Sequence, residues 1–250
     1  MNLSWKLGRV AGIDVFLHPT FLLLLLLPGV AERLPLVLAT FGCVLLHELG
    51  HALAARRFGI GTADITLYPI GGVARLTRMP RAPGVELLIA LAGPAVNLAI
   101  AVALAPLALT GGGFAMDLMA INLVLALFNL IPAFPMDGGR VLRALLGGWI
   151  GRARATSFAA AVGRTLAVGF GVYSLLSLAP FQVALAVFIY LVAGAEEASV
   201  LAEEGRRAGA AGNVDWSTPA GYRWVQTHPG VWRLARNGSA SRGSSWSGAR

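Results

Sequence analysis

The sequence predicts an all-α polytopic membrane protein with six transmembrane helices and a small membrane-associated β segment around residues 62–78. Three observations predict this fold class. Of the 250 residues, 56% are hydrophobic and 13% are charged, whereas about a quarter of residues are charged in soluble domains. The mean hydropathy is +0.70. Six apolar runs also approach the roughly 20 residues that a helix needs to cross a bilayer. This composition excludes a disordered chain and disfavours a water-soluble domain.

The predicted spans follow one another along the first 200 residues. The first is short, and an alternative with five spans lays it in the membrane interface, which would put the two termini on opposite sides. The six runs are about Pro19–Val30 with the preceding turns from Val15, Leu34–Ala55, Val85–Leu109, Phe114–Ile131, Ser157–Leu178 and Phe181–Gly194.

Arginine and lysine alternate along these links. They gather before the first span, between the second and third, between the fourth and fifth, and after the sixth, whereas the other links hold Arg33 or none. The positive-inside rule then predicts that both termini are cytoplasmic. The net charge of +8 does not indicate nucleic acid, because the cations flank apolar runs and do not form one aromatic-studded surface. A lipid bilayer with anionic headgroups is the expected partner.

Two segments between the predicted spans have their own patterns. Residues 62–78 mix β-formers with Pro69, Gly71 and Gly72, which predicts two short strands about a glycine turn. Gly138–Ile150 is amphipathic, and we expect its arginines at lipid headgroups.

The chain divides by composition into a six-span core, residues 1–205, and a cytoplasmic tail, residues 206–250, rich in Ala, Gly, Ser, Arg and Trp. The tail is predicted to be partly disordered, over Asn237–Arg250. Its part Val214–Leu234 is expected to form a small hairpin or to lie at the membrane surface.

The most informative motif is His47-Glu48-Leu49-Gly50-His51, inside the second predicted span. Residues four apart share a helix face, so both imidazoles can reach one metal ion. Glu48 lies about 100° round the helix, where it can contact a water at the metal but is poorly placed as a ligand. Three such side chains at hydrocarbon depth are costly unless they share a partner. The motif therefore predicts a zinc site, with one Zn²⁺ per chain.

Asp137 is the candidate for the third ligand, because it follows the fourth span in a segment whose prolines and glycines break the helix. Broken backbone at membrane depth must face protein or a water-filled cavity. The alternative is that Asp137 caps the following helix. Cys43 lies one turn before His47, but three ligands on one straight helix would spread over about 12 Å, so it is interpreted as a packing residue. His18 is interpreted as interfacial.

These motifs resemble those of the site-2 proteases, zinc metalloproteases that cut within the membrane. The resemblance covers residues 8–200 and rests on HELGH at 47–51, LAGPAVN at 91–97, NLIPAFPMDGGR at 129–140, Gly71-Gly72 and the entry at 18–21. It implies His47, His51 and Asp137 as zinc ligands and Glu48 as the catalytic base.

The resemblance also implies that Asn129 and Pro132 help to present the substrate backbone, and that Asn97 supports the cleft. For Asn97 an interhelical hydrogen bond is the alternative, as are close packing and a kink for Gly93-Pro94. The Gly71-Gly72 strand offers an edge to an unwound substrate. No insertion is long enough for a PDZ domain, and the tail is too short for paired CBS modules, so the chain resembles a minimal core.

The sequence therefore predicts a multi-pass metalloendopeptidase of the cell membrane. It would hydrolyse a peptide bond in or near the transmembrane segment of a membrane protein substrate, as part of regulated intramembrane proteolysis. The alternative is a catalytically inactive metal-binding protein, either a pseudoprotease regulator or a metal transporter. Glu48 disfavours that alternative, because a binding site needs no carboxylate beside its open position.

Overall fold

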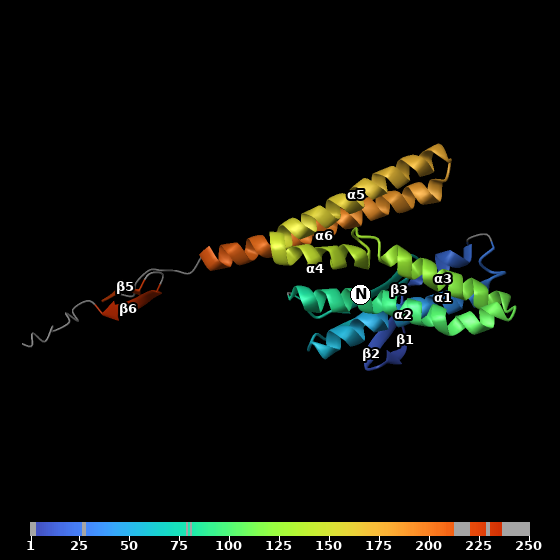
Figure 1. Ribbon diagram of the computed structural model, residues 1–250, viewed down its shortest axis with the longest axis horizontal. Helices are drawn as coiled ribbons and strands as arrows, with labels where there is room; N and C mark the ends of the chain where they lie inside the picture. Colours follow the sequence, from blue (N-terminus) through green and yellow to red (C-terminus); the bar gives the residue numbers. More distant parts are fainter. Residues whose placement is uncertain are drawn as a thin grey trace, which may run out of the picture. The chain divides into compact units, whose positions relative to one another are not determined.

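The computed structural model describes residues 4–26, 29–78, 80, 82–212, 221–228 and 231–236. The chain divides into two units, Met1–Glu203 and Glu204–Arg250. Among the described residues, the first unit holds a four-stranded sheet, a short 3-10 helix and the helices α1 to α5 with most of α6 (Figure 1). The second unit holds the end of α6 and a two-stranded hairpin.

The four-stranded sheet has the order β1 (Trp5–Val10), β2 (Ile13–Leu17), β3 (Thr62–Tyr68) and β4 (Gly71–Leu76). β2 and β3 are parallel, and the two outer pairs are antiparallel. Hence β4 is an edge strand, and the β3–β4 hairpin confirms the strands predicted around residues 62–78.

An ion pair ties the edge strand to its neighbour. Arg75 Nε of β4 donates to Asp64 Oδ1 of β3 at 2.9 Å. The hydrogen bond and charge of Asp64 raise the pKa of Arg75, so the guanidinium is charged at every pH at which the protein is folded.

The described residues are mostly helical with a small sheet, as expected, but the strands β1 and β2 were not predicted, and the sheet has four strands where two were expected. Both strands carry a signal in the sequence, because apolar and polar residues alternate in Trp5–Val10 and a turn follows at Ala11-Gly12. Both turn residues have positive φ, 51° and 87°, as tight hairpin turns between twisted strands require. The signal was missed because Val15–Leu17 were joined to the apolar run that follows them.

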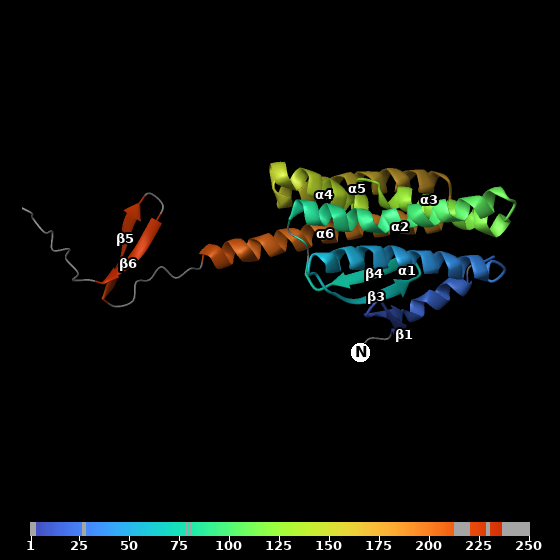
Figure 2. The same ribbon diagram turned by 60° about the horizontal axis from the view of Figure 1, so that its bottom comes forward.

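The helix α1 (Leu34–Arg57) lies alongside β3 and β4, and α2 (Pro83–Leu109) lies on the other side of α1 (Figure 2). A buried cluster joins α1 to the sheet through Leu49 and Ala52 of the helix and Ile13 and Ile65 of the strands. The helix that contains HELGH is thus held between a sheet and a second helix.

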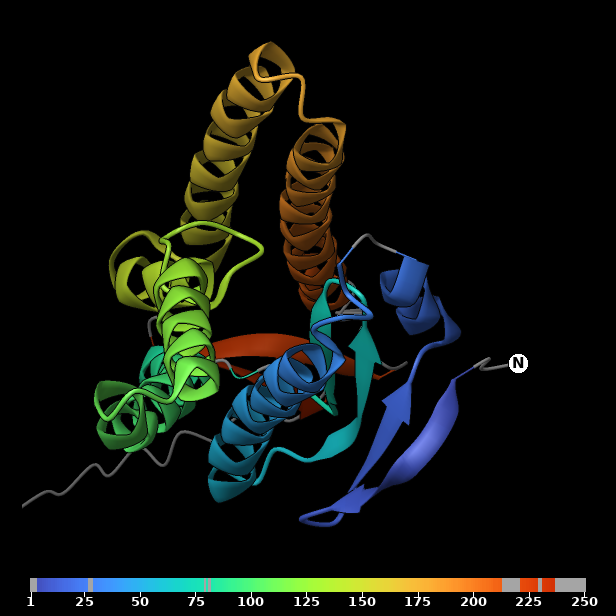
Figure 3. The same ribbon diagram turned by 90° about the vertical axis from the view of Figure 1, so that its right-hand side faces the viewer.

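The remaining helices are α3 (Gly113–Asn129), α4 (Asp137–Ile150), α5 (Arg152–Leu176) and α6 (Pro180–Gly212). Figure 3 shows α5 and the first part of α6 as a pair joined by a short turn. Arg164 Nη1 of α5 donates to Glu197 Oε2 of α6 at 2.6 Å. The pair accounts for Arg164, whose charge would otherwise lie unpaired in a predicted span.

The helix α4 confirms the amphipathic segment predicted after the fourth span. Arg143, one of the two arginines expected at lipid headgroups, is instead buried. Arg143 is 2% exposed and its Nε donates to Glu86 Oε1 at 2.7 Å. A buried carboxylate partner makes this position more favourable for Arg143 than the membrane surface.

Within the part of the chain that the structure describes, four helices are long and apolar enough to cross a membrane: α1, α2, α5 and Pro180–Arg206 of α6. The apolar helix α3 has 17 residues and a length of about 26 Å, somewhat less than a hydrocarbon core of about 30 Å. The six predicted spans are therefore not confirmed.

The first predicted span is wrong as a transmembrane helix. Its described part consists of the strand β2 and an eight-residue 3-10 helix, Pro19–Leu26. At about 2.0 Å per residue such a helix is about 16 Å long, which is half of the bilayer core. The alternative with five spans, in which this run lies in the interface, stays a prediction.

In the second unit, β5 (Tyr222–His228) and β6 (Val231–Arg236) form an antiparallel pair. This pair matches the hairpin alternative for Val214–Leu234. The predicted disorder of Asn237–Arg250 lies outside the described residues.

Candidate metal centre

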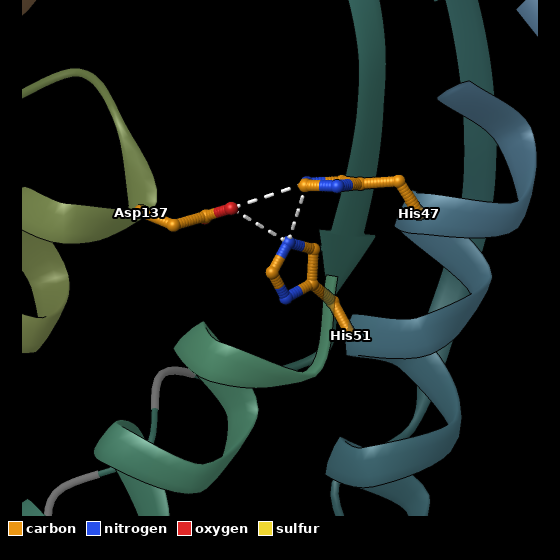
Figure 4. A group of neighbouring side chains, drawn as sticks. All are labelled: His47, His51 and Asp137. Atoms are coloured by element: carbon orange, nitrogen blue, oxygen red, sulfur yellow. Dashed lines mark hydrogen bonds and ion pairs between the residues drawn. The ribbon is translucent and has the colours of Figure 1, made fainter. Parts of the chain in front are cut away.

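The helix α1 presents two imidazoles on one face. His47 and His51 are one turn apart, and their Nε2 atoms are 3.0 Å from each other (Figure 4). Their exposed fractions are 6% and 9%. The i, i+4 geometry predicted from HELGH is therefore present in the structure.

Asp137, the first residue of α4, reaches the same point from the opposite side (Figure 4). Its Oδ2 lies 3.1 Å from His47 Nε2 and 3.0 Å from His51 Nε2. The residue at the N-cap of α4 is Met136, and the cap has no side-chain hydrogen bond. The helix-capping alternative for Asp137 thus has no support here.

The segment before Asp137 is folded tightly enough to require glycine nearby. The Phe134–Pro135 peptide is cis. A Cβ on Gly138 would lie 2.2 Å from the carbonyl oxygen of Ile131, and one on Gly163 of α5 would lie 2.2 Å from that of Phe134. The broken backbone predicted between the fourth and fifth spans is therefore present, and close packing determines where Asp137 starts its helix.

Hydrogen bonds behind the two rings determine which nitrogen of each ring faces inward. His47 Nδ1 lies 2.8 Å from Asn97 Oδ1, and His51 Nδ1 lies 2.7 Å from the carbonyl oxygen of Ile89. Both partners can only accept, so each Nδ1 is the donor. The two Nε2 atoms therefore face Asp137 and are the ring atoms available to a metal ion.

Three potential ligand atoms at such distances can share one metal ion. Tetrahedral zinc with ligand distances of about 2.0–2.2 Å keeps its ligand atoms about 3.3 Å apart. The observed separations of 3.0–3.1 Å differ from this value by only about 0.3 Å. Of the His, Cys, Asp and Glu side chains described, these three form the group that could hold a metal ion, and their donor set fits zinc.

Gly93 of α2 lies against both rings, and it was not predicted as a site residue. A Cβ there would be 2.3 Å from His51 Nε2 and 2.6 Å from His47 Nε2. The absence of a side chain at residue 93 therefore leaves the space in which the imidazoles meet. Asn97 makes an interhelical hydrogen bond from α2 to His47 of α1, and its role in supporting the cleft stays a prediction.

Glu48 lines the same cavity as the three candidate ligands. Its Oε2 accepts a hydrogen bond from the backbone N–H of Ala74 in β4 at 3.2 Å. Gly72 lies against its aliphatic stem, where a Cβ would be 2.6 Å from Glu48 Cγ. The edge strand thus approaches the carboxylate closely enough to need a glycine.

The cavity has a volume of about 330 Å³. It brings Gly71, Gly72 and Asn129 together with Glu48, as predicted, but Asn97 and Pro132 are not among its lining residues. Its wall also includes residues that the sequence did not single out: Tyr68, Ile70, Val73, Ala74, Leu76, Ile89, Pro135, Arg140, Phe188 and Val192. These come from strands and helices far apart in the chain, so no local pattern could have grouped them.

Two other candidates lie beside the centre. Cys43 is buried, and its Sγ accepts from Asn122 Nδ2 of α3 at 3.3 Å, as expected of a packing residue. His18 stacks on Tyr68 with ring centroids 4.9 Å apart. It thus contacts the cavity wall and lies outside the ligand group.

The family model of peptidase family M50 matches residues 35–119 and 113–170, which together are more than half of the chain.

The chain belongs to peptidase family M50.

Two curated relatives support this assignment. A zinc metalloprotease of Methanocaldococcus jannaschii is 38% identical over 216 residues, which are 81% of this chain and 62% of the relative. Rip3 of Mycobacterium tuberculosis is 38% identical over 168 residues, 56% of this chain and 43% of Rip3. This M50 chain thus spans about half to two thirds of the length of these curated relatives.

A solved structure supports the fold. The site-2 protease from Methanocaldococcus jannaschii matches with a TM-score of 0.62 and 36% identity, over 78% of this chain and 95% of that one. The predicted resemblance to site-2 proteases is confirmed. With its four long apolar helices, this M50 member is a multi-pass membrane protein.

Proposed function

We propose that this chain is a zinc-dependent intramembrane endopeptidase. One observation supports it above all: the acceptor atoms of His47, His51 and Asp137 converge within 3.1 Å, and Glu48 lines the same cavity. The names of the M50 relatives point to the same chemistry.

In this proposal His47, His51 and Asp137 hold one Zn²⁺. Zinc, when bound, would lower the pKa of a water to about 7 and polarise a peptide carbonyl. The chain's own contribution is the orientation of the ligands. Asn97 and Ile89 fix the two rings with Nε2 inward, and such partners typically affect metal affinity by 10–100-fold.

Glu48 is the proposed general base. It would accept a proton from the attacking water and deliver it to the departing nitrogen. The N–H of Ala74 donates to Glu48 Oε2 at 3.2 Å and so holds this side chain beside the edge strand. This role supports an enzyme over a metal-binding pseudoprotease or transporter.

The edge strand β4 is the proposed binding place for the substrate backbone. A transmembrane helix satisfies its own backbone, so its scissile bond must unwind before attack. An unwound segment can add to a sheet edge through main-chain hydrogen bonds. β4 is such an edge, and its residues from Gly71 to Ala74 line the cavity beside Glu48. Asn129 lines the same cavity and would contact the same segment, and Pro132 would act through the shape of its loop.

The proposed location is the cell membrane, with both termini cytoplasmic. HELGH lies in the C-terminal half of α1, and by the positive-inside rule Arg56 and Arg57 at the end of that helix indicate its cytoplasmic side. Cleavage is then expected near the cytoplasmic leaflet. The proposed substrate is a single-pass or other transmembrane protein, processed in regulated intramembrane proteolysis. The proposed domains are the core, residues 1–205, and the tail, residues 206–250.

The test uses the full chain purified in detergent with a single-pass substrate. Glu48→Gln should retain the zinc content of the parent and slow cutting by about 10²–10⁴-fold, which is the usual contribution of a general base. Glu32→Gln is the matched control, because Glu32 is exposed and lies outside the cavity. Equal cutting by Glu48→Gln and the parent would exclude Glu48 as the base, and a zinc-free parent would exclude the metal site.

A further inference from the structure

A network of four charged side chains joins the four helices α2, α4, α5 and α6. Arg143 of α4 donates through Nε to Glu86 Oε1 of α2 at 2.7 Å and through Nη1 to Glu196 Oε1 of α6 at 2.9 Å. Arg152 of α5 donates to Glu86 Oε2 at 3.0 Å. Two cations and two anions cancel, so the network is neutral.

The centre of this network is out of contact with solvent. Arg143 is 2% exposed and Glu86 is 4% exposed. An arginine keeps its charge in any protein environment, so a buried guanidinium needs its partners in place. The Cζ atom of Arg143 also lies 4.9 Å from the ring centroid of Phe134. These contacts fix both the orientation of the Arg143 guanidinium and its buried position.

Arg143 is connected to the metal centre through a short, rigid path. Asp137 is the first residue of α4, and Arg143 follows six residues later, about 9 Å along the axis. Phe134, under the guanidinium, lies three residues before Asp137. Arg143 therefore contacts the chain before Asp137 and belongs to the helix after it.

The helix α2 supplies the common reference for both halves of the centre. Glu86, Ile89, Gly93 and Asn97 are spaced by three, four and four residues, and so lie on one stripe of the helix. Ile89 and Asn97 hold the imidazoles of α1, whereas Glu86 holds Arg143 of α4. The stripe thus fixes the donors from α1 and the donor from α4 on one rigid element.

We propose that the Glu86–Arg143 ion pair positions Asp137 against His47 and His51, and that it thereby determines the zinc affinity of the centre. Glu86 and Arg143 are positioning residues, since neither contacts the ligand atoms. The inference rests on the zinc site proposed above.

The test measures zinc affinity of the full-length protein in detergent by competition with a chromogenic chelator. Arg143→Gln and Glu86→Gln should each bind zinc about tenfold more weakly, at the lower end of the effect of residues that support metal ligands. The visible spectrum of the Co²⁺-loaded protein should change as well, because the carboxylate at 137 would retreat from the ion. The double variant should lose no more than the weaker-binding single variant, since both act through one contact.

Arg164→Gln is the matched control. It removes an arginine–glutamate pair between α5 and α6 that has no link to α2 or α4, so it should bind zinc like the parent. Glu86→Gln leaves Arg143 its second partner, Glu196, so it decides the question if Arg143→Gln does not fold. If the parent binds zinc and the folded variants bind it equally well with an unchanged Co²⁺ spectrum, the positioning role is wrong. A parent without zinc would instead refute the site itself.

Discussion

Replacing Gly93 with alanine should abolish tight zinc binding while leaving the fold intact. The added methyl would lie 2.3 Å from His51 Nε2 and 2.6 Å from His47 Nε2. An ordinary carbon–nitrogen contact is at least about 3.4 Å, so the rings would have to retreat by about 1.1 and 0.8 Å. Metal sites tolerate deviations of about 0.2 Å in ligand distance, and the required retreat is several times larger.

Separation of the two helices would relieve this clash only by giving up their close packing. A Cβ on Gly50 of α1 would lie 2.8 Å from Val96 Cγ2 and 2.9 Å from the carbonyl oxygen of Ala92, so α1 and α2 are already in contact beside the rings. The rings must therefore move. We expect zinc affinity to fall by at least 100-fold, equivalent to about 2.7 kcal/mol, and peptide cleavage to fall with it.

The assay is chelator competition for zinc on the detergent-purified protein, with circular dichroism to verify the helical content. Gly84→Ala is the matched control, because it lies in the same helix and its added Cβ has no neighbour within 4 Å. If Gly93→Ala binds zinc within about threefold of the parent, the two imidazoles do not meet where the structure places them.

Three further outcomes are expected. Asn97→Leu should weaken zinc binding by about 10–100-fold, whereas Asn97→Asp should retain it, because aspartate still accepts from His47 Nδ1; chelator competition separates the two. Cys43→Ala should keep the parent's zinc content in elemental analysis, and a loss of zinc would make the thiol a ligand. Gly163→Ala should lower the free energy of unfolding by about 1–3 kcal/mol, since its Cβ would lie 2.2 Å from the carbonyl oxygen of Phe134; an unchanged Tm would contradict this.

The sequence predicted those parts of the centre that depend on local spacing. The spacing of four residues from His47 to His51 places both rings on one face of any helix, whatever its surroundings. Asp137 lies 86 residues beyond His51, yet prolines and glycines around it predicted a break in which a carboxylate could face inward. The strands at 62–78 were predicted for the same local reason, from β-formers on both sides of a glycine turn.

The remainder depends on packing between distant segments. Nothing in the local pattern of α2 indicates that Ile89 supplies a carbonyl to His51, or that Gly93 provides space for two rings. Arg143 follows the amphipathic pattern of a surface helix, and only the position of Glu86, 57 residues earlier, buries it. The prediction of a membrane span at the first apolar run failed for a different reason. Length and hydropathy cannot distinguish a membrane span from a strand followed by a 3-10 helix.

The stripe on α2 has a consequence for anyone who would transplant this centre. A scaffold that copies only the two segments bearing the histidines and the aspartate would reproduce the donors but omit the surface against which they are aligned. A faithful copy needs three helices, and the third would contribute an acid, a backbone carbonyl, a bare Cα and an amide while touching no metal at all.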